Sequence, residues 1–118
     1  MLPTFDTETG VKKFLAAGLG AILAVMIVTV SSAAPTAGRQ EELVNLVKHD
    51  CGSCHGLTLK GGLGSALLPK QLSERPDEDL VAIILEGLTD TPMPPWEGQL
   101  SEEEAAWIVQ LLKKGVPE

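Results

Sequence analysis

Cys51, Cys54 and His55 form the pattern C-x-x-C-H, which limits what the chain can become more than any other feature. No other cysteine occurs in the 118 residues, so a multi-bridge disulfide scaffold and a four-cysteine zinc or iron–sulfur site are excluded. Two thiols at this spacing can each add to a vinyl group of one haem, and the histidine is then held beneath the iron. The motif therefore predicts one haem c, with Cys51 and Cys54 as thioether anchors and His55 as an axial ligand.

Other uses of this cysteine pair explain the sequence less well. A thioredoxin-like redox pair needs a βαβ setting and gives no reason for His55. A zinc site needs further ligands, and only His49 and His55 are available as histidines. A disulfide between Cys51 and Cys54 would be strained and would close almost no loop. A haem-free thiol switch stays as an alternative, and it predicts that denatured protein releases no haem peptide.

Met93 is the candidate for the second axial ligand, because it is the one methionine after the N-terminal apolar segment. It follows His55 by 38 residues, which is enough chain to pass around a haem and return over its other face. Three prolines within residues 91–96 stiffen the approach of this weak thioether ligand. His49 is the only other candidate, but it stands two residues before Cys51 on the same helix and is expected on the surface.

Two further residues are assigned to the haem pocket. Leu67 is expected to line the haem face, together with Leu63 and Leu68. Trp96 either closes the pocket and offers its indole N–H to a haem propionate, or belongs to the core. Trp107 is expected to pack between the first and last helices.

Residues 14–30 are apolar, without charge or proline, and Lys12 and Lys13 precede them. This pattern predicts that everything after Val30 is exported to the periplasm. Small residues before Ala34 suit cleavage of a signal peptide, while the length also suits a retained anchor. We therefore expect a signal peptide or uncleaved anchor at 1–33, a linker at 34–39 and a haem domain at 40–118. The domain is then soluble or tethered, with membrane contact only through 14–30.

The haem domain is predicted to be all-α. Amphipathic spacing indicates helices over residues 40–49 and about 76–86, and a third that begins after a capping box at Ser101. Glycines concentrated in residues 52–69 indicate a loop that wraps something bulky. No segment alternates as a strand would. The net charge of −7 argues against a nucleic-acid partner.

These elements resemble, in order, a class I c-type cytochrome over nearly all of residues 40–116. The segments CGSCHGLTLKGGLG, TPMPPW and LSEEEAAWIVQLLK resemble more narrowly the small monohaem cytochromes associated with dissimilatory nitrite reductase, the NirC type. The resemblance implies three main helices around one covalently attached haem c, ligated by His55 and Met93.

The resemblance also implies a function. Such proteins are periplasmic one-electron carriers rather than enzymes, and they donate electrons to a cd1-type nitrite reductase or serve maturation of its d1 haem. The acidic charge favours a partner with a basic rim. The alternative is a five-coordinate haem sensor, or an enzyme that binds a small molecule after Met93 is displaced.

The chain departs from the class I pattern at two places. Proline often follows the glycine of the wrapping loop, and its carbonyl accepts a hydrogen bond from the ligating histidine. Here Ser65 follows Gly64, so a less rigid segment must make that bond. A glycine commonly permits close crossing of the terminal helices, whereas Leu43 and Val47 occupy this face, which leaves the packing distance open.

Overall fold

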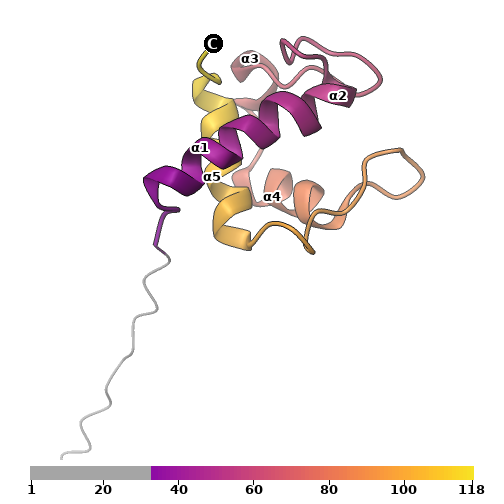
Figure 1. The fold of residues 1–118 in the computed structure, drawn as a ribbon. Coiled ribbons are helices and arrows are strands. Elements are labelled where there is room, and N and C mark those ends of the chain that lie inside the picture. Colours follow the sequence, from indigo (N-terminus) through magenta and orange to yellow (C-terminus); the bar gives the residue numbers. More distant parts are fainter. Residues whose placement is uncertain (1–32) are drawn as a thin grey trace, which may run out of the picture. The chain divides into compact units, whose positions relative to one another are not determined.

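The computed structural model describes residues 33–118, and all regular structure in that part of the chain is helical (Figure 1). The predicted all-α class is therefore confirmed. The apolar segment 14–30 and all but the last residue of the expected leader lie outside the described residues. Within residues 33–118, none of the helices has both the length and the apolarity needed to cross a membrane. The elements are α1 (Ala37–Leu46), the π-helix η1 (Val47–Cys51), α2 (Gly52–His55), α3 (Pro69–Leu72), α4 (Asp77–Glu86) and α5 (Glu102–Lys114).

The first helix begins earlier than expected. Thr36 is its N-cap, and the threonine hydroxyl accepts a hydrogen bond from the backbone N–H of Arg39 at 3.4 Å. This cap satisfies one of the free N–H groups of the first turn. The helix therefore includes residues 37–39, which we expected to belong to the linker 34–39.

The haem-attachment motif lies at the end of a continuous helical segment rather than after it. α1, η1 and α2 follow one another without a gap, and together they form the long rod across the upper part of Figure 1. Cys51 ends the π-helical turn, and Cys54 and His55 end α2. Gly56 follows with φ +89°, a conformation that glycine adopts without strain. The helical segment thus ends at His55, and after Gly56 the chain turns back so that the following loop contacts His55.

The other two long helices agree closely with their predicted positions. α4 begins after Pro76 with three acidic residues in its first turn, where they complement the helix dipole. α5 begins with the predicted capping box, in which Ser101 and Glu104 each bond the other's backbone N–H. The single turn α3, which starts at Pro69, was not predicted, because four residues are too few to show helical spacing.

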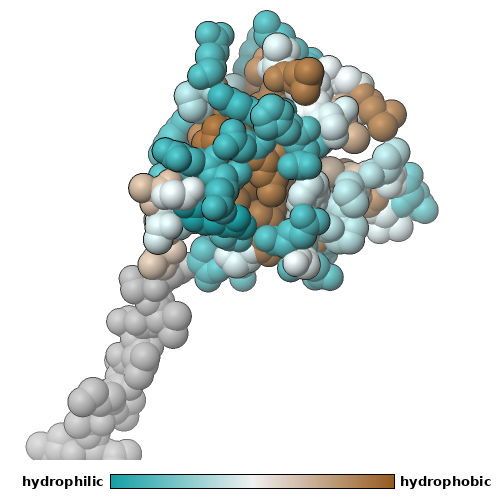
Figure 2. Space-filling view, viewed as in Figure 1, coloured by the Kyte–Doolittle hydropathy of each residue, from teal (hydrophilic) through white to brown (hydrophobic). Residues whose placement is uncertain are grey.

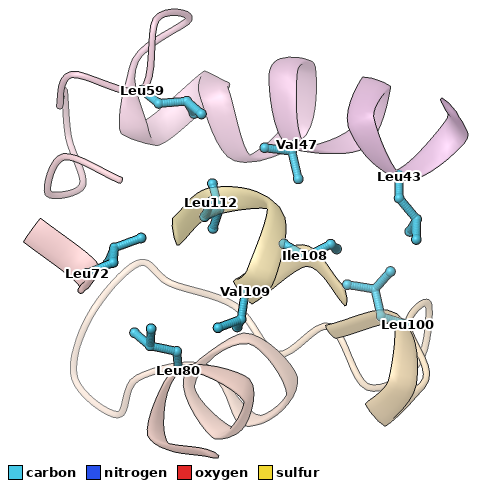
Figure 3. Close-up of a cluster of buried hydrophobic side chains, with 9 residues drawn as sticks. All are labelled: Leu43, Val47, Leu59, Leu72, Leu80, Leu100, Ile108, Val109 and Leu112. Atoms are coloured by element: carbon cyan, nitrogen blue, oxygen red, sulfur yellow. The ribbon is translucent and has the colours of Figure 1, made fainter. Parts of the chain in front are cut away.

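The core lies where α1 and η1 meet α5, as Figure 3 shows. Leu43 and Val47 are 0% exposed, and Ile108 and Val109 of α5 are each 1% exposed. The close helix crossing therefore accommodates branched side chains at the positions where a glycine is common. The buried hydrophobic cluster consists of Leu43, Val47, Leu59, Leu72, Leu80, Leu100, Ile108, Val109 and Leu112.

Ion pairs join the helix ends around this core. Arg39 of α1 contacts Glu42 at 2.7 Å and Glu104 of α5 at 2.5 Å. The hydrogen bonds from Arg39 and from the Ser101 backbone N–H lower the pKa of Glu104. At the other end of α5, Lys113 contacts the carboxylate of Asp77 and donates to the backbone carbonyl of Arg75 at 2.6 Å.

Candidate haem site

One cavity of about 580 Å³ brings together the four residues that the sequence analysis selected. Cys51, Cys54 and His55 reach its wall from η1 and α2, and Met93 reaches it from the proline-rich loop after α4. This volume falls within the range of ordinary ligand-binding pockets. The apolar part of the wall consists, besides Met93, of Leu63, Leu67, Leu72, Leu80, Ile83, Ile84, Leu88, Pro92, Pro94, Trp96, Leu100, Ile108, Val109 and Leu112.

The wall includes both pocket residues selected from the sequence, Leu67 and Trp96. Trp96 also packs against the buried core, so its two alternative roles are compatible. Leu63 lines the cavity, whereas Leu68 packs against the core outside it. Sequence reasoning missed the leucines and isoleucines that α4 and α5 contribute. Their apolar stripes were recognised as helix-packing faces, and nothing in a stripe tells which residues face a cofactor.

The imidazole of His55 is held by the backbone of the glycine-rich loop. Its Nδ1 atom lies 2.6 Å from the carbonyl oxygen of Ser65. A carbonyl oxygen only accepts hydrogen bonds, so Nδ1 carries the proton and the lone pair of Nε2 is left for a metal. A Cβ atom at Gly64 would lie only 2.7 Å from Nδ1 of His55. The missing proline thus does not prevent the histidine bond, and Gly64 lets the loop approach the ring.

Further backbone bonds hold the same loop against the motif. Gly64 donates its N–H to the carbonyl of Cys54, and Gly61 donates to the carbonyl of His55, both at 2.8 Å. A Cβ at Gly62 would lie 2.8 Å from the Cys54 oxygen. The concentration of glycines therefore serves close contact between the loop and the backbone of the motif, whereas the sequence analysis expected them to let the loop pass close to something bulky.

No disulfide joins Cys51 and Cys54, and both side chains are partly buried. Burial, with a smaller effect of the nearby Asp50 carboxylate, raises the pKa of the Cys51 thiol to about 11. Reactive redox cysteines have lowered pKa values, because the thiolate is the nucleophile. The environment of Cys51 therefore disfavours its thiolate form.

Met93 is partly buried on a loop that is fastened to the end of α4. The N–H of Trp96 points to the carbonyls of Ile84 and Leu85, at 3.1 and 3.0 Å. Leu88 donates its N–H to the carbonyl of Met93 at 3.2 Å. The loop thus returns over α4, and it presents Met93 to the cavity that His55 also lines.

Charged side chains are rare in the cavity wall. Within the described residues, Arg75 is the one lysine or arginine that lines it, and Asp50 is the one carboxylate. His49 is exposed and lies outside the wall, as does Trp107, which packs against the core. A wall of this kind, with two thiols, an imidazole, a thioether and one cation, fits a flat apolar macrocycle that carries carboxylates.

Large exposed hydrophobic side chains occur on the two loops that border the cavity. Leu57 and Leu63 are each 76% exposed on the loop after α2, and Leu88 is 45% exposed on the loop after α4. Figure 2 shows hydrophobic residues protruding beside the end of α2, while most of the remaining visible surface is hydrophilic. Leu63 and Leu88 line the cavity, and Leu57 lies on the same loop as Leu63. We call these three exposed leucines the apolar rim.

Comparison with known proteins places these observations in a family. Residues 38–112 match the family model described as cytochrome C oxidase, cbb3-type, subunit III. The chain is 56% identical over 81 residues to cytochrome c55X of Pseudomonas aeruginosa, which covers 69% of this chain and 68% of the relative. It is similar to the solved structure of the c-type cytochrome NirC, with 53% identity and a TM-score of 0.68, covering 70% of this chain and all of that one.

A longer protein contains a related domain. The solved structure of the dihydro-heme d1 dehydrogenase NirN in complex with DHE matches with 34% identity and a TM-score of 0.56. The match covers 63% of this chain but only 16% of the dehydrogenase. The likeness therefore concerns one small part of that protein.

Proposed function

The chain belongs to the c-type cytochromes, and we propose that it is a periplasmic one-electron carrier with a single haem c ligated by His55 and Met93. Membership of this family supports an electron-transfer protein with covalently bound haem rather than an enzyme. The axial ligands, the single haem and the periplasmic location are the further content of the proposal.

One observation supports this ligation above the others. His55 lines the cavity from the end of α2, where its ring bonds the backbone of the following loop, and Met93 lines the same cavity from a loop that backbone hydrogen bonds fasten to α4. The bond from Nδ1 of His55 to Ser65 leaves Nε2 as the donor atom toward iron. Two ligands fixed in this way favour a metal centre whose geometry changes little between oxidation states.

Each residue of the cavity then has a distinct role. When bound, the haem supplies an iron that cycles between Fe(III) and Fe(II). Cys51 and Cys54 anchor the macrocycle, and Leu67 and Trp96 exclude water from its faces. Arg75 balances the negative charge of the haem carboxylates at the cavity wall. A methionine ligand raises the reduction potential relative to a second histidine, because the thioether stabilises Fe(II).

We propose that the electron partner belongs to dissimilatory nitrite reduction. The relatives include NirC and a dihydro-heme d1 dehydrogenase, and removal of hydrogen from a dihydro-haem requires an electron acceptor. The carrier would serve d1 haem maturation in that way, or donate electrons to a cd1-type nitrite reductase. The apolar rim would meet the partner in a small transient interface, and the net negative charge of the chain suits a partner with basic residues.

We further propose that residues 1–33 form the export signal or anchor, and that the haem domain extends to residue 118. The helical part of this domain begins at Ala37. Cleavage before Ala34 would release a soluble domain, whereas retention would leave it tethered through 14–30.

The test combines a mass spectrum with an absorption spectrum of the purified native protein. The expected mass is that of the polypeptide plus one haem, and it also shows whether the chain begins at Ala34. The oxidised protein should show the red-region sulfur-to-iron band, and Met93→Ala should abolish it and lower the midpoint potential. Met93→Leu, which keeps the side-chain volume, should behave like Met93→Ala.

Two results would contradict this proposal, and a third would decide between its two partner roles. A polypeptide mass without haem would overturn all of it. Haem-loaded wild type without the sulfur-to-iron band would favour the five-coordinate sensor or enzyme instead. A deletion strain in which the nitrite reductase persists without its d1 group would assign the protein to maturation, and not to electron donation to the finished reductase.

A further inference from the structure

We propose that the hydroxyl group of Thr91 positions Met93 for the iron, so that Thr91 is a positioning residue of the haem site. This inference rests on the ligation proposed above. The sequence analysis gave Thr91 no role. Its role is visible only in the contacts of the loop.

The Thr91 hydroxyl joins the two ends of the loop segment that carries the ligand. It donates a hydrogen bond to the carbonyl of Leu88 at 2.8 Å and accepts one from the N–H of Met93 at 3.3 Å. The N–H of Leu88 in turn donates to the carbonyl of Met93 at 3.2 Å. Leu88, Thr91 and Met93 therefore form a closed ring of hydrogen bonds, which we call the Thr91 ring.

The prolines make this ring more important than an ordinary turn. Pro92, Pro94 and Pro95 have no N–H group, so Met93 holds the only backbone donor between residues 92 and 95. That one donor goes to the Thr91 hydroxyl. No other backbone N–H of this stretch can replace the bond, so the N–H side of Met93 is held by a single side-chain oxygen.

Gly87 allows the ring to close against the end of α4. It has φ +73°, and a Cβ at this position would lie 2.7 Å from the carbonyl oxygen of Met93. The same carbonyl accepts the bond from Leu88. The Met93 backbone is thus held on its N–H side by Thr91 and on its carbonyl side by Leu88.

Thr91 is exposed, so water competes for these bonds and the loop can open. An external ligand such as imidazole binds the iron only in molecules whose Met93 has left it. Its apparent affinity therefore rises in proportion to the population of that open state. One net hydrogen bond changes such a population by about threefold to tenfold.

The experiment uses the haem-loaded protein with imidazole as the probe. Thr91→Val removes the hydroxyl but keeps the shape of the side chain. It should weaken the sulfur-to-iron band and tighten apparent imidazole binding by about threefold to tenfold. Thr91→Ser, which keeps the hydroxyl, should restore values close to wild type. Thr89→Val is the matched control, because no hydrogen bond of the Thr89 hydroxyl occurs in residues 33–118, and it should change neither readout.

The outcomes separate this inference from the proposed function. Wild type without the band would overturn the ligation and the role of Thr91 together. Wild type with the band and an unchanged Thr91→Val variant would overturn only the role of Thr91, as would a Thr91→Ser variant as weak as Thr91→Val. Haem content and far-UV circular dichroism of each variant report folding. If Thr91→Val yields too little holoprotein, Thr91→Ala removes the same hydroxyl and carries the same expectation.

Discussion

The Nδ1 atom of His55 lies 2.6 Å from the carbonyl oxygen of Ser65, ten residues further along the chain. The acceptor belongs to the backbone, so the side chain at position 65 need not be proline for the bond to form. The hydrogen bond from the N–H of Gly64 to the carbonyl of Cys54 provides the rigidity that a proline ring would otherwise supply. The orientation of the ligand therefore depends on the path of the loop more than on the residue that follows Gly64.

Gly64→Ala should disturb this orientation. The added Cβ would lie 2.7 Å from Nδ1 and Cε1 of His55, so the ring or the loop must move. We expect a loss of about 1–3 kcal/mol in the free energy of unfolding, together with a shifted midpoint potential. Urea denaturation and redox titration measure the two effects. Gly98→Ala is the control, because nothing lies within 4 Å of its added Cβ, and equal losses in both variants would contradict the prediction.

Arg75→Gln should lower the midpoint potential of the haem. The ferric state carries one more positive charge than the ferrous state, so removing a nearby cation favours oxidation. We expect a decrease on the order of tens of millivolts, measured by redox titration at low salt. Lys70→Gln removes the same charge from an exposed site outside the cavity wall and should have a much smaller effect. An unchanged midpoint potential in Arg75→Gln would show that the Arg75 guanidinium does not affect the haem.

Leu43→Ala should cost much more stability than Leu57→Ala. Leu43 is fully buried between the helices, and its truncation leaves a cavity, so the free energy of unfolding should fall by about 2–5 kcal/mol. Leu57 is 76% exposed, and its truncation should change stability by less than about 0.5 kcal/mol. Urea denaturation of the two haem-loaded variants gives the comparison. A large loss in Leu57→Ala would mean that this residue is not part of an exposed rim.

Acid should weaken the contact between α1 and α5. Arg39 and the Ser101 backbone lower the pKa of Glu104 in the folded protein. The stability that this carboxylate contributes is therefore present above the ordinary glutamate pKa of about 4.3, and it is lost as the pH falls through the lower folded value. Wild type should be more stable than Glu104→Gln at pH 7, and the difference should shrink below about pH 4. Urea denaturation at several pH values measures it.

The control for the acid prediction is Glu102→Gln in the same first turn of α5. It removes one negative charge near the same helix N-terminus but leaves the Arg39 contact intact. A Glu102→Gln variant with the same pH dependence as Glu104→Gln would assign the effect to the helix dipole and not to the ion pair.

Local patterns in the sequence were sufficient to predict the positions of the long helices. The capping box at Ser101 and the acidic first turn after Pro76 each depend on residues within four positions of one another, so both helix starts could be predicted. The predicted start of the first helix was three residues too late. The Thr36 cap is weak, and the ion pair that holds Arg39 is made with Glu104, 65 residues further along the chain, so neither was visible as a local pattern. The helical turn Gly52–His55 was missed, because glycine and cysteine are poor helix formers on their own.

The sequence by itself determined the chemistry of this protein: which side chains could bond a haem, and which residue types surround them. Covalent attachment and ligation need particular atoms, and the chain holds few cysteines, histidines and methionines from which to choose. Only the tertiary structure decided how those atoms are held. The bond from His55 to Ser65, the glycines pressed against backbone, and the Thr91 ring all join groups whose meeting depends on the path of a loop, and that path is set by packing against α4 and α5.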